Sequence, residues 1–328
     1  MTKQVEDSIF WVDQLNDFGR RRQPCFFIID FEMKDVQIIA FENMQDIYLN
    51  FNGKELGQFP LAHSKNPPVS LSKFPIDYRN YLGQFMTLQQ HIKYGNTFLL
   101  NLTHKTPISC ALSLSEIFSN TTAKYKLLYK DEFVMFSPEC FVKIKEDQIF
   151  SYPMKGTINA DVPNAREILL SDTKEMAEHY TIVDLIRNDL SQVSKKVSVT
   201  KFRYIDEIKT SDSTLLQVSS EIKGDLGVDW QDQLGSLFYK LLPAGSISGA
   251  PKDKTVNIIK ELELIDRGFY TGVAGIFDGV SVDSAVCIRF IEKEGGQLYF
   301  RSGCGITSMS NPELEYQEMI DKIYVPIA

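Results

Sequence analysis

The sequence predicts an α/β protein of the α+β type, in which largely antiparallel sheets are covered by helices. The β-prone segments arrive in runs, such as the three within residues 132–154 and the three within residues 272–303. Parallel strands need a long crossover, usually a helix, so runs of strands favour antiparallel or mixed sheets. The chain has 328 residues, of which 43% are hydrophobic, enough to bury a large core.

The predicted elements of the first half are short strands and two amphipathic helices. Aromatic and β-branched residues at short spacing mark the strands, and apolar residues three or four apart mark the helices. Strands are expected within residues 25–31, 36–41, 97–103, 132–139, 140–145 and 148–154. Helices are expected over residues 81–95, ending at Gly95, and over residues 173–193, with Thr173 as N-cap.

The helices and strands of the second half are predicted from the same residue patterns. A helix over residues 230–242 is followed by a glycine-rich loop that feeds a second helix ending near residue 265. Three strands follow, within residues 272–279, 284–292 and 297–303. The last helix opens at Asn311 and Pro312 and closes before Pro326. The proline- and serine-bearing loop at residues 64–75 is the best candidate for a boundary.

Composition argues against several classes of protein. The formal net charge of −8 and the pI near 5.2 oppose a general nucleic-acid or anionic-membrane surface. No apolar run approaches the roughly 18 residues of a membrane span, and the N-terminus lacks the apolar core of a signal peptide. Five cysteines without paired spacing suit a reducing compartment. We expect a cytoplasmic protein that binds neither nucleic acid nor membrane.

Two short patterns each place two carboxylates three residues apart. They are Glu175 with Glu178, and Glu315 with Glu318. Each pair shares one helix face, and if the two helices face each other the four oxygen donors suit Mg²⁺. The alternative is that both pairs lie on ordinary solvated helix faces.

Three basic residues have both a structural and a chemical interpretation. Lys155, in the stretch SYPMKGTIN, lies at a tightly shaped turn, either as a carboxylate-pairing residue or as a reagent. Arg289 interrupts an apolar segment, where a buried guanidinium needs an internal anion or a bound carboxylate. Lys322 lies four residues after Glu318, either in a helix pair or as a cation for a substrate carboxylate.

The two glycines of RSGCGIT also have two possible interpretations. The backbone amides near Gly303 and Gly305 could approach an anion closely, or the two glycines could mark a strand bulge. The stretch GSISGAPK precedes a helix but has the wrong spacing for a nucleotide-binding loop.

Taken together, these stretches resemble one family, the chorismate-utilising enzymes. The resemblance runs in order over roughly residues 80–325 through SPE, PMKGT, EHYTIVDLIRNDL, GSISGAPK, RGFYTGVAGIFDG, AVCIRFI and RSGCGITSMSNPELEYQEMIDK. Within the family, a lysine at the position of Lys155 is typical of aminodeoxychorismate synthase component I, whereas anthranilate synthases have alanine there. The resemblance implies two packed sheets with helices outside, as in anthranilate synthase component I. Residues 1–75 would form a reduced N-terminal portion of the same unit, and residues 76–328 the chorismate-binding catalytic region.

The resemblance also implies roles for individual residues. Mg²⁺ would be held by Glu178 and Glu318, supported by Glu175 and Glu315, and would grip the ring carboxylate of chorismate while the C4 hydroxyl leaves. Glu139 matches the general acid that protonates this hydroxyl. The positions that match substrate-binding residues of the family are Gly156, Thr157, Tyr270, Gly272, Arg289, Gly303, Gly305 and Lys322.

The implied reaction makes Lys155 a nucleophile. Its amine adds to C2 of chorismate, and ammonia from a glutamine amidotransferase partner then enters at C4 and expels the lysine. The product, 4-amino-4-deoxychorismate, needs a separate lyase to become 4-aminobenzoate, the folate precursor. Because a free lysine has a pKa of about 10.4, burial or a nearby positive charge such as Mg²⁺ must lower the pKa of Lys155.

Two positions depart from the family pattern. Leu99 stands where a glutamine is expected and where isochorismate and salicylate synthases have a lysine base, which argues against water as nucleophile. Gln217 replaces a histidine but keeps the capacity to form hydrogen bonds. The alternatives are an anthranilate synthase component I and a non-catalytic chorismate-binding paralogue.

Overall fold

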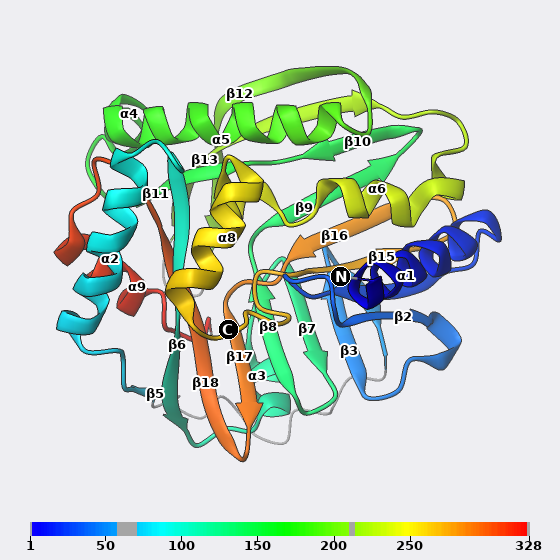
Figure 1. Cartoon of the computed structure of the whole chain (residues 1–328), viewed down its shortest axis with the longest axis horizontal. Coiled ribbons are helices and arrows are strands. Elements are labelled where there is room, and N and C mark those ends of the chain that lie inside the picture. Colours follow the sequence, from blue (N-terminus) through cyan, green and yellow to red (C-terminus); the bar gives the residue numbers. More distant parts are fainter. Residues whose placement is uncertain (1, 58–70, 210–213, 327–328) are drawn as a thin grey trace.

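The computed structural model describes residues 2–57, 71–209 and 214–326 (Figure 1). Their strands form two nine-stranded sheets, and the strand pairs in both are antiparallel. The fold class predicted from the runs of strands is therefore confirmed. Residues 64–70 of the candidate boundary loop lie outside the described residues, and the division of the chain near residue 75 stays a prediction.

Sheet A contains the strands that carry Lys155 and the residue after Glu139. Its order is β11 (Met154–Asn159), β13 (Thr214–Asp225), β10 (Gln148–Ser151), β9 (Cys140–Lys145), β16 (Val282–Val286), β15 (Val273–Phe277), β1 (Cys25–Ile29) and β2 (Val36–Ala40), with β12 (Lys195–Lys209) paired to β13.

Sheet B contains the strand with Gly303 and Gly305. Its order is β14 (Gly249–Ala250), β6 (Leu99–Cys110), β18 (Gln297–Ile306), β17 (Phe290–Glu294), β8 (Phe133–Ser137), β7 (Tyr125–Tyr129), β3 (Ile47–Phe51) and β4 (Lys54–Leu56), with β5 (Leu71–Lys73) paired to β6.

Helices cover the surfaces of the sheets that do not face each other (Figure 1). Those over sheet A are α1 (Thr2–Arg20), α4 (Ala165–Ser171), α5 (Thr173–Ser191), the turn η2 (Trp230–Gln233) and α6 (Leu234–Leu241). Those beside β6 and β18 are α2 (Tyr78–Lys93), α7 (Gly245–Ser248), α8 (Lys252–Glu263) and α9 (Pro312–Asp321), while α3 (Leu114–Asn120) packs on β7 and β8. A short 3-10 turn, η1 (Phe41–Asn43), follows β2.

The central strand β1 shows how the layers pack. All five of its residues are buried, and alternate side chains enter different cores. Phe27 and Ile29 join the core under the helices, whereas Phe26 and Ile28 join apolar residues of β3, β7 and β8 in the core between the two sheets. A continuous apolar run therefore marks a strand covered on both faces.

Two of the points at which the chain passes from one sheet to the other lie side by side. Between β8 and β9 the crossing contains Glu139, and between β16 and β17 it contains Arg289. The Phe136 amide donates to the Arg289 carbonyl at 3.1 Å, and the Val286 amide donates to the Glu139 carbonyl at 3.2 Å. Two residues with predicted functions thus lie at linked crossings.

Some predicted elements differ in detail, and other elements were not predicted. Residues 284–292 form two strands in different sheets, because Arg289 has a φ of 52° that ends the extended backbone. The N-cap of α5 is Asp172, whose carboxylate accepts the Glu175 amide at 2.9 Å, so the prediction of Thr173 was wrong by one residue. Helix α1 was not predicted; its Trp11 and Leu15 enter the core under the helices.

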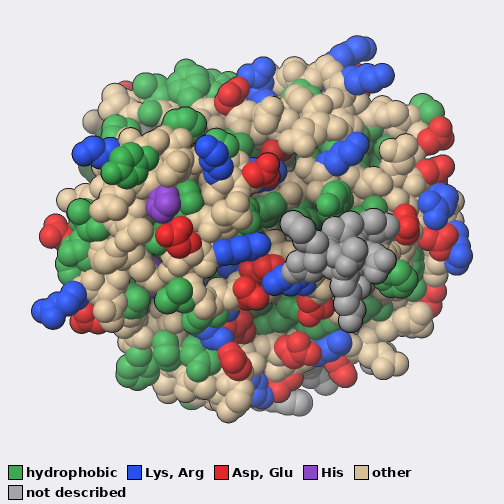
Figure 2. All heavy atoms as spheres, in the orientation of Figure 1, with side chains coloured by type: hydrophobic (Ala, Val, Ile, Leu, Met, Phe, Trp, Pro, Cys, Tyr) green, Lys and Arg blue, Asp and Glu red, His purple; other side chains and the backbone are tan. Residues whose placement is uncertain are grey.

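The surface carries charges of both signs. Figure 2 shows acidic and basic side chains interspersed over the described part of one face. No helix among the described residues is both long and apolar enough to cross a membrane.

Candidate active site

Lys155 lies at an irregularity in an otherwise regular sheet. The register of β11 against β13 shifts between Met154 and Thr157, and Gly156 has a φ of +82°, a conformation that favours glycine. The Lys155 ammonium forms an ion pair with Glu178 on α5, with 2.6 Å between Nζ and Oε2. The side chain of Glu178 is only 6% exposed, so its interpretation as part of a solvated helix face is wrong.

The four predicted metal ligands lie on two helices that meet near Lys155. Glu175 and Glu178 come from α5, and Glu315 and Glu318 come from α9, whose first turn is capped by Asn311. The carboxylates of Glu178, Glu175 and Glu318 all act electrostatically on the Lys155 ammonium. One oxygen of Glu315 and one of Glu318 lie within 4.8 Å of each other.

The charge environment of Lys155 differs from the expectation. Burial lowers the pKa of Lys155, but the attraction of Glu178, with further contributions from Glu175 and Glu318, outweighs burial and raises it. The protein alone therefore keeps the amine protonated, contrary to the idea that burial suffices to make it neutral.

Lys322 supplies a second ammonium to this group of carboxylates. Its Nζ lies 2.8 Å from a Glu318 oxygen and donates to the Gly303 carbonyl at 2.9 Å. The helix pair predicted from the spacing is therefore present. Four carboxylates with Lys155 and Lys322 leave a formal charge of −2, and oxygen donors with this charge fit a divalent cation such as Mg²⁺.

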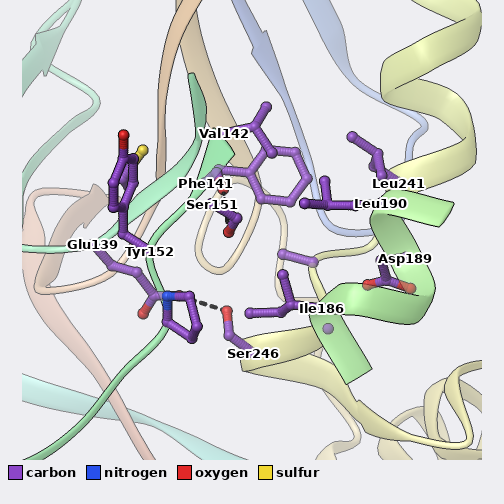
Figure 3. A pocket seen from close by; sticks show the side chains of 14 residues that line it. Glu139, Phe141, Val142, Ser151, Tyr152, Ile186, Asp189, Leu190, Leu241 and Ser246 are labelled. Atoms are coloured by element: carbon purple, nitrogen blue, oxygen red, sulfur yellow. Dashed lines mark hydrogen bonds between the residues drawn. The ribbon is translucent and has the colours of Figure 1, made fainter. Parts of the chain in front are cut away.

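Glu139 is the predicted general acid of the site. Ser246 on α7 donates to its Oε1 at 2.5 Å (Figure 3). Burial raises the pKa of Glu139, and this effect outweighs the Ser246 hydrogen bond and the charge of Arg289, both of which lower it. A carboxyl group that retains its proton suits a general acid. Beside it is a cavity of about 20 Å³, room for about one water.

Arg289 has spare hydrogen-bonding capacity. Its Nε is buried and has no hydrogen-bond partner among the residues that the structure describes, and its guanidinium carbon lies 5.4 Å from the centre of the Tyr324 ring. An unsatisfied buried guanidinium nitrogen is costly unless an anion completes it. Both interpretations of Arg289 therefore stay open, because Glu139 is an internal anion close enough to interact with its charge, and the unsatisfied Nε–H can donate to a bound carboxylate.

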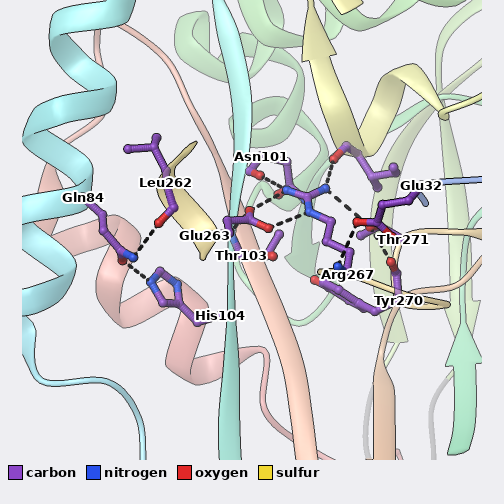
Figure 4. A network of polar contacts seen from close by, with 11 residues as sticks. Glu32, Gln84, Asn101, Thr103, His104, Leu262, Glu263, Arg267, Tyr270 and Thr271 are labelled. Atoms are coloured by element: carbon purple, nitrogen blue, oxygen red, sulfur yellow. Dashed lines mark hydrogen bonds and ion pairs between the residues drawn. The ribbon is translucent and has the colours of Figure 1, made fainter. Parts of the chain in front are cut away.

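A buried network fixes the loop that carries Tyr270 (Figure 4). Arg267, 1% exposed, forms two hydrogen bonds with the Glu263 carboxylate at 2.6 and 2.8 Å. Its guanidinium also donates to the Ile247 carbonyl next to Ser246 and to the Asn101 carbonyl of β6. This guanidinium connects α8, β6 and α7, the short helix that holds Ser246. Sequence analysis missed the role of Arg267, because nothing in RGFYTG shows that these segments converge.

Gly303 and Gly272 allow neighbouring backbone segments to pack closely at the site. The register of β18 with β6 runs without a shift from Leu298 to Ile306, so the bulge interpretation of Gly303 and Gly305 is wrong. A Cβ on Gly303 would lie 2.6 Å from the Leu102 carbonyl oxygen. Gly272 is similarly packed against the Ile29 carbonyl.

Leu99 and Gln217, which depart from the family pattern, both contact other residues of the predicted site. Gln217 donates to the Thr157 hydroxyl at 3.4 Å across β13 and β11, so the substituted position contacts a predicted substrate residue. Leu99 is buried at the start of β6 and lies against Gly305. Two residues that sequence analysis did not place in the site, Ser246 and Cys304, also contact predicted site residues.

The chain belongs to the family of chorismate binding enzymes, whose family model matches residues 34–328. It is 50% identical over 322 residues to an "Uncharacterized PabA-like protein" of Haemophilus influenzae, covering 97% of this chain and 96% of the relative. It is 33% identical over 280 residues to an anthranilate synthase component 1 of Haloarcula marismortui, covering 79% of this chain and 55% of the relative.

Solved structures show the same fold. Anthranilate synthase component I from Streptococcus pneumoniae has a TM-score of 0.66 and 28% identity, covering 78% of this chain and 59% of that chain. The menaquinone-specific isochorismate synthase from Escherichia coli has a TM-score of 0.72 and 16% identity, covering 97% of this chain and 81% of that chain. At this low identity, the second likeness concerns the fold alone.

Proposed function

We propose that this protein is the synthase component of an aminodeoxychorismate synthase, which converts chorismate and ammonia to 4-amino-4-deoxychorismate. The observation that carries the proposal is the position of Lys155, a primary amine 2.6 Å from Glu178 within a group of four carboxylates. An amine at this place is close to the proposed metal and to the substrate carboxylate that the metal would hold.

The proposed mechanism assigns each step to a residue of this chain. Bound Mg²⁺, held by Glu178 and Glu318 with support from Glu175 and Glu315, would neutralise the carboxylate of chorismate and help the C4 hydroxyl to leave. The neutral Lys155 amine attacks C2, and Glu139 gives its proton to the departing hydroxyl, which leaves as water. Ammonia then forms a bond to C4 while the C2–nitrogen bond of Lys155 breaks.

The other site residues orient the substrate in this proposal. The unsatisfied Arg289 Nε–H donates to a carboxylate of chorismate, and Lys322, Thr157 and the backbone at Gly303 and Gly305 line the remaining positions. Gly156, Gly272 and Tyr270 shape the surrounding backbone. Ammonia comes from a glutamine amidotransferase subunit, and a separate lyase consumes the product.

An anthranilate synthase is the second candidate, favoured by relatives of 31–34% identity that are named anthranilate synthase component 1. The deciding experiment is mass spectrometry of the products formed from chorismate, Mg²⁺ and ammonium at high pH, with lyase added. Formation of 4-aminobenzoate supports the proposal, and formation of anthranilate supports the second candidate. Absence of turnover even with an amidotransferase supports a non-catalytic binding protein.

Removing the Ser246 hydroxyl is expected to shift the pH dependence of the reaction. The Ser246 hydrogen bond lowers the pKa of Glu139, so Ser246→Ala should raise that pKa further. Because the acid form of Glu139 is the active one, the loss of activity at rising pH should move to higher pH. Ser248→Ala is the control, since Ser248 lies on the same short helix and donates to the Ala244 carbonyl. A limb that moves to lower pH would contradict the assignment.

Magnesium is expected to change the pH dependence in the opposite direction. The pKa of Lys155 is raised by Glu178, so a divalent cation that binds Glu178 removes this effect. The rise in rate that accompanies deprotonation of Lys155 should therefore shift to lower pH as Mg²⁺ increases. Rate profiles against pH at limiting and saturating Mg²⁺ test this, and superimposable profiles would refute it.

A further inference from the structure

Cys304 belongs to the core under the helices and also lies beside the carboxylates of α9. It occupies β18 between Gly303 and Gly305 and is 2% exposed. Its Sγ lies within 4.8 Å of one oxygen of Glu315 and one oxygen of Glu318. The thiol donates to the Glu315 carbonyl at 3.3 Å, and the Lys322 ammonium is 3.8 Å from the same sulfur. Burial outweighs the effect of Lys322 and raises the pKa of Cys304 to about 12, so a bound cation must displace the thiol proton.

A thiol at this position has no use in a site for Mg²⁺. Magnesium is a hard cation that takes oxygen donors in octahedral geometry, whereas thiolates select softer cations such as Zn²⁺. Mixed sets of cysteine and carboxylate donors are chemically suited to Zn²⁺ and its congeners.

A buried hydroxyl group also lies near these donors. Tyr81 on α2 is 1% exposed, and its hydroxyl has no hydrogen-bond partner within the described part of the chain. The Tyr81 ring packs against Tyr316 of α9, with 5.1 Å between the ring centroids. Burial raises the pKa of Tyr81, and the charges of Cys304, Glu315 and Glu318 raise it further. A hydroxyl there can donate to a metal-bound thiolate or carboxylate, as outer groups of metal sites do.

We infer that Cys304, with Glu315 and Glu318, binds a thiophilic divalent cation of the Zn²⁺ class. Zinc–sulfur bonds of about 2.3 Å and zinc–oxygen bonds of about 2.1 Å place tetrahedral donors about 3.6 Å apart. Donors already within 4.8 Å need to move by only about 1 Å to reach this arrangement. The competition of this cation with Mg²⁺ for Glu318 rests on the proposed function, whereas the binding itself does not.

The test is a titration of the purified, metal-stripped full chain with Cd²⁺, a spectroscopic substitute for Zn²⁺. Binding through sulfur produces an ultraviolet sulfur-to-cadmium charge-transfer band, which we expect to saturate at one equivalent. Cys304→Ala should abolish the band and weaken Cd²⁺ binding by about 100-fold, measured by calorimetry. Mg²⁺ binding should change by less than about threefold, because magnesium does not use the thiolate.

Control variants distinguish Cd²⁺ binding at Cys304 from binding at other cysteines. Cys110, the partly exposed cysteine of β6, serves as the matched control, and Cys110→Ala should keep the band. Cys304→Ser preserves the side-chain volume if the alanine variant folds poorly, and it should also lack the band. Tyr81→Phe should weaken Cd²⁺ binding by about tenfold without removing the band.

The outcomes distinguish this inference from the proposed function. A band that persists in Cys304→Ala, cadmium binding without a band, or no binding at all would overturn the inference. None of these results affects the proposed amination, which is tested by its product. Conversely, a band in a protein that does not turn over chorismate would support the cation site and contradict the proposed function.

Discussion

Replacing Lys155 by alanine is expected to reduce formation of 4-amino-4-deoxychorismate by about 10³-fold or more, because the variant lacks the nucleophile of the proposed route. Product formation is measured by mass spectrometry at saturating chorismate, Mg²⁺ and ammonium. Chorismate binding should persist, since the carboxylates of α5 and α9 remain.

The variant Lys155→Arg tests whether Lys155 is a reagent or only a structural cation. Lys155→Arg can still pair with Glu178, but a guanidinium does not become neutral in a protein. If Lys155 only balances the buried charge of Glu178, arginine should restore activity. We expect arginine to be as inactive as alanine, whereas Lys145→Ala, at an exposed position of β9, should retain full activity. Continued formation of anthranilate by Lys155→Ala would support the second candidate function.

Replacing Arg267 by alanine is expected to cost about 3–5 kcal/mol of the free energy of unfolding. The side chains of Arg267 and Glu263 are 1% and 5% exposed, so the variant would leave a carboxylate buried without its cation. It would also remove the donors to the Ile247 and Asn101 carbonyls. Urea unfolding of the variant and the parent protein measures the loss as a lower transition midpoint.

Two controls define the origin of this loss. Arg187→Ala removes an exposed arginine paired with Asp184 and should cost less than about 1 kcal/mol. A double variant, Arg267→Met with Glu263→Leu, removes both charges and should be more stable than Arg267→Ala alone. If Arg267→Ala unfolds like the Arg187 variant, the network does not stabilise the fold as argued.

Much of the fold could be predicted from local patterns. Alternation and β-branched composition located about half of the described strands but missed β12 and β13, and apolar periodicity located α2, α5, α8 and α9. The segment at 284–292 was misread as one strand because apolar composition continues through Arg289. Its left-handed backbone and the change of sheet depend on the partners that β16 and β17 find far along the chain.

The candidate site was predicted in its residues but not in its electrostatics. Two carboxylates three residues apart must share a helix face, so the sequence by itself determined the pairing of Glu175 with Glu178 and of Glu315 with Glu318. The ordered motifs determined the family, which the comparisons confirm.

Only the tertiary structure decided which charges face each other. Lys155 and Glu178 are 23 positions apart in the sequence and 2.6 Å apart in space, and this approach keeps the amine protonated. Likewise, Ser246 reaches Glu139, and Cys304 and Tyr81 join the carboxylates of α9, through packing of segments that are distant in sequence. Helix and strand periods are set by the local backbone, whereas pKa values and metal preference depend on charges within a few ångströms, which only folding brings together.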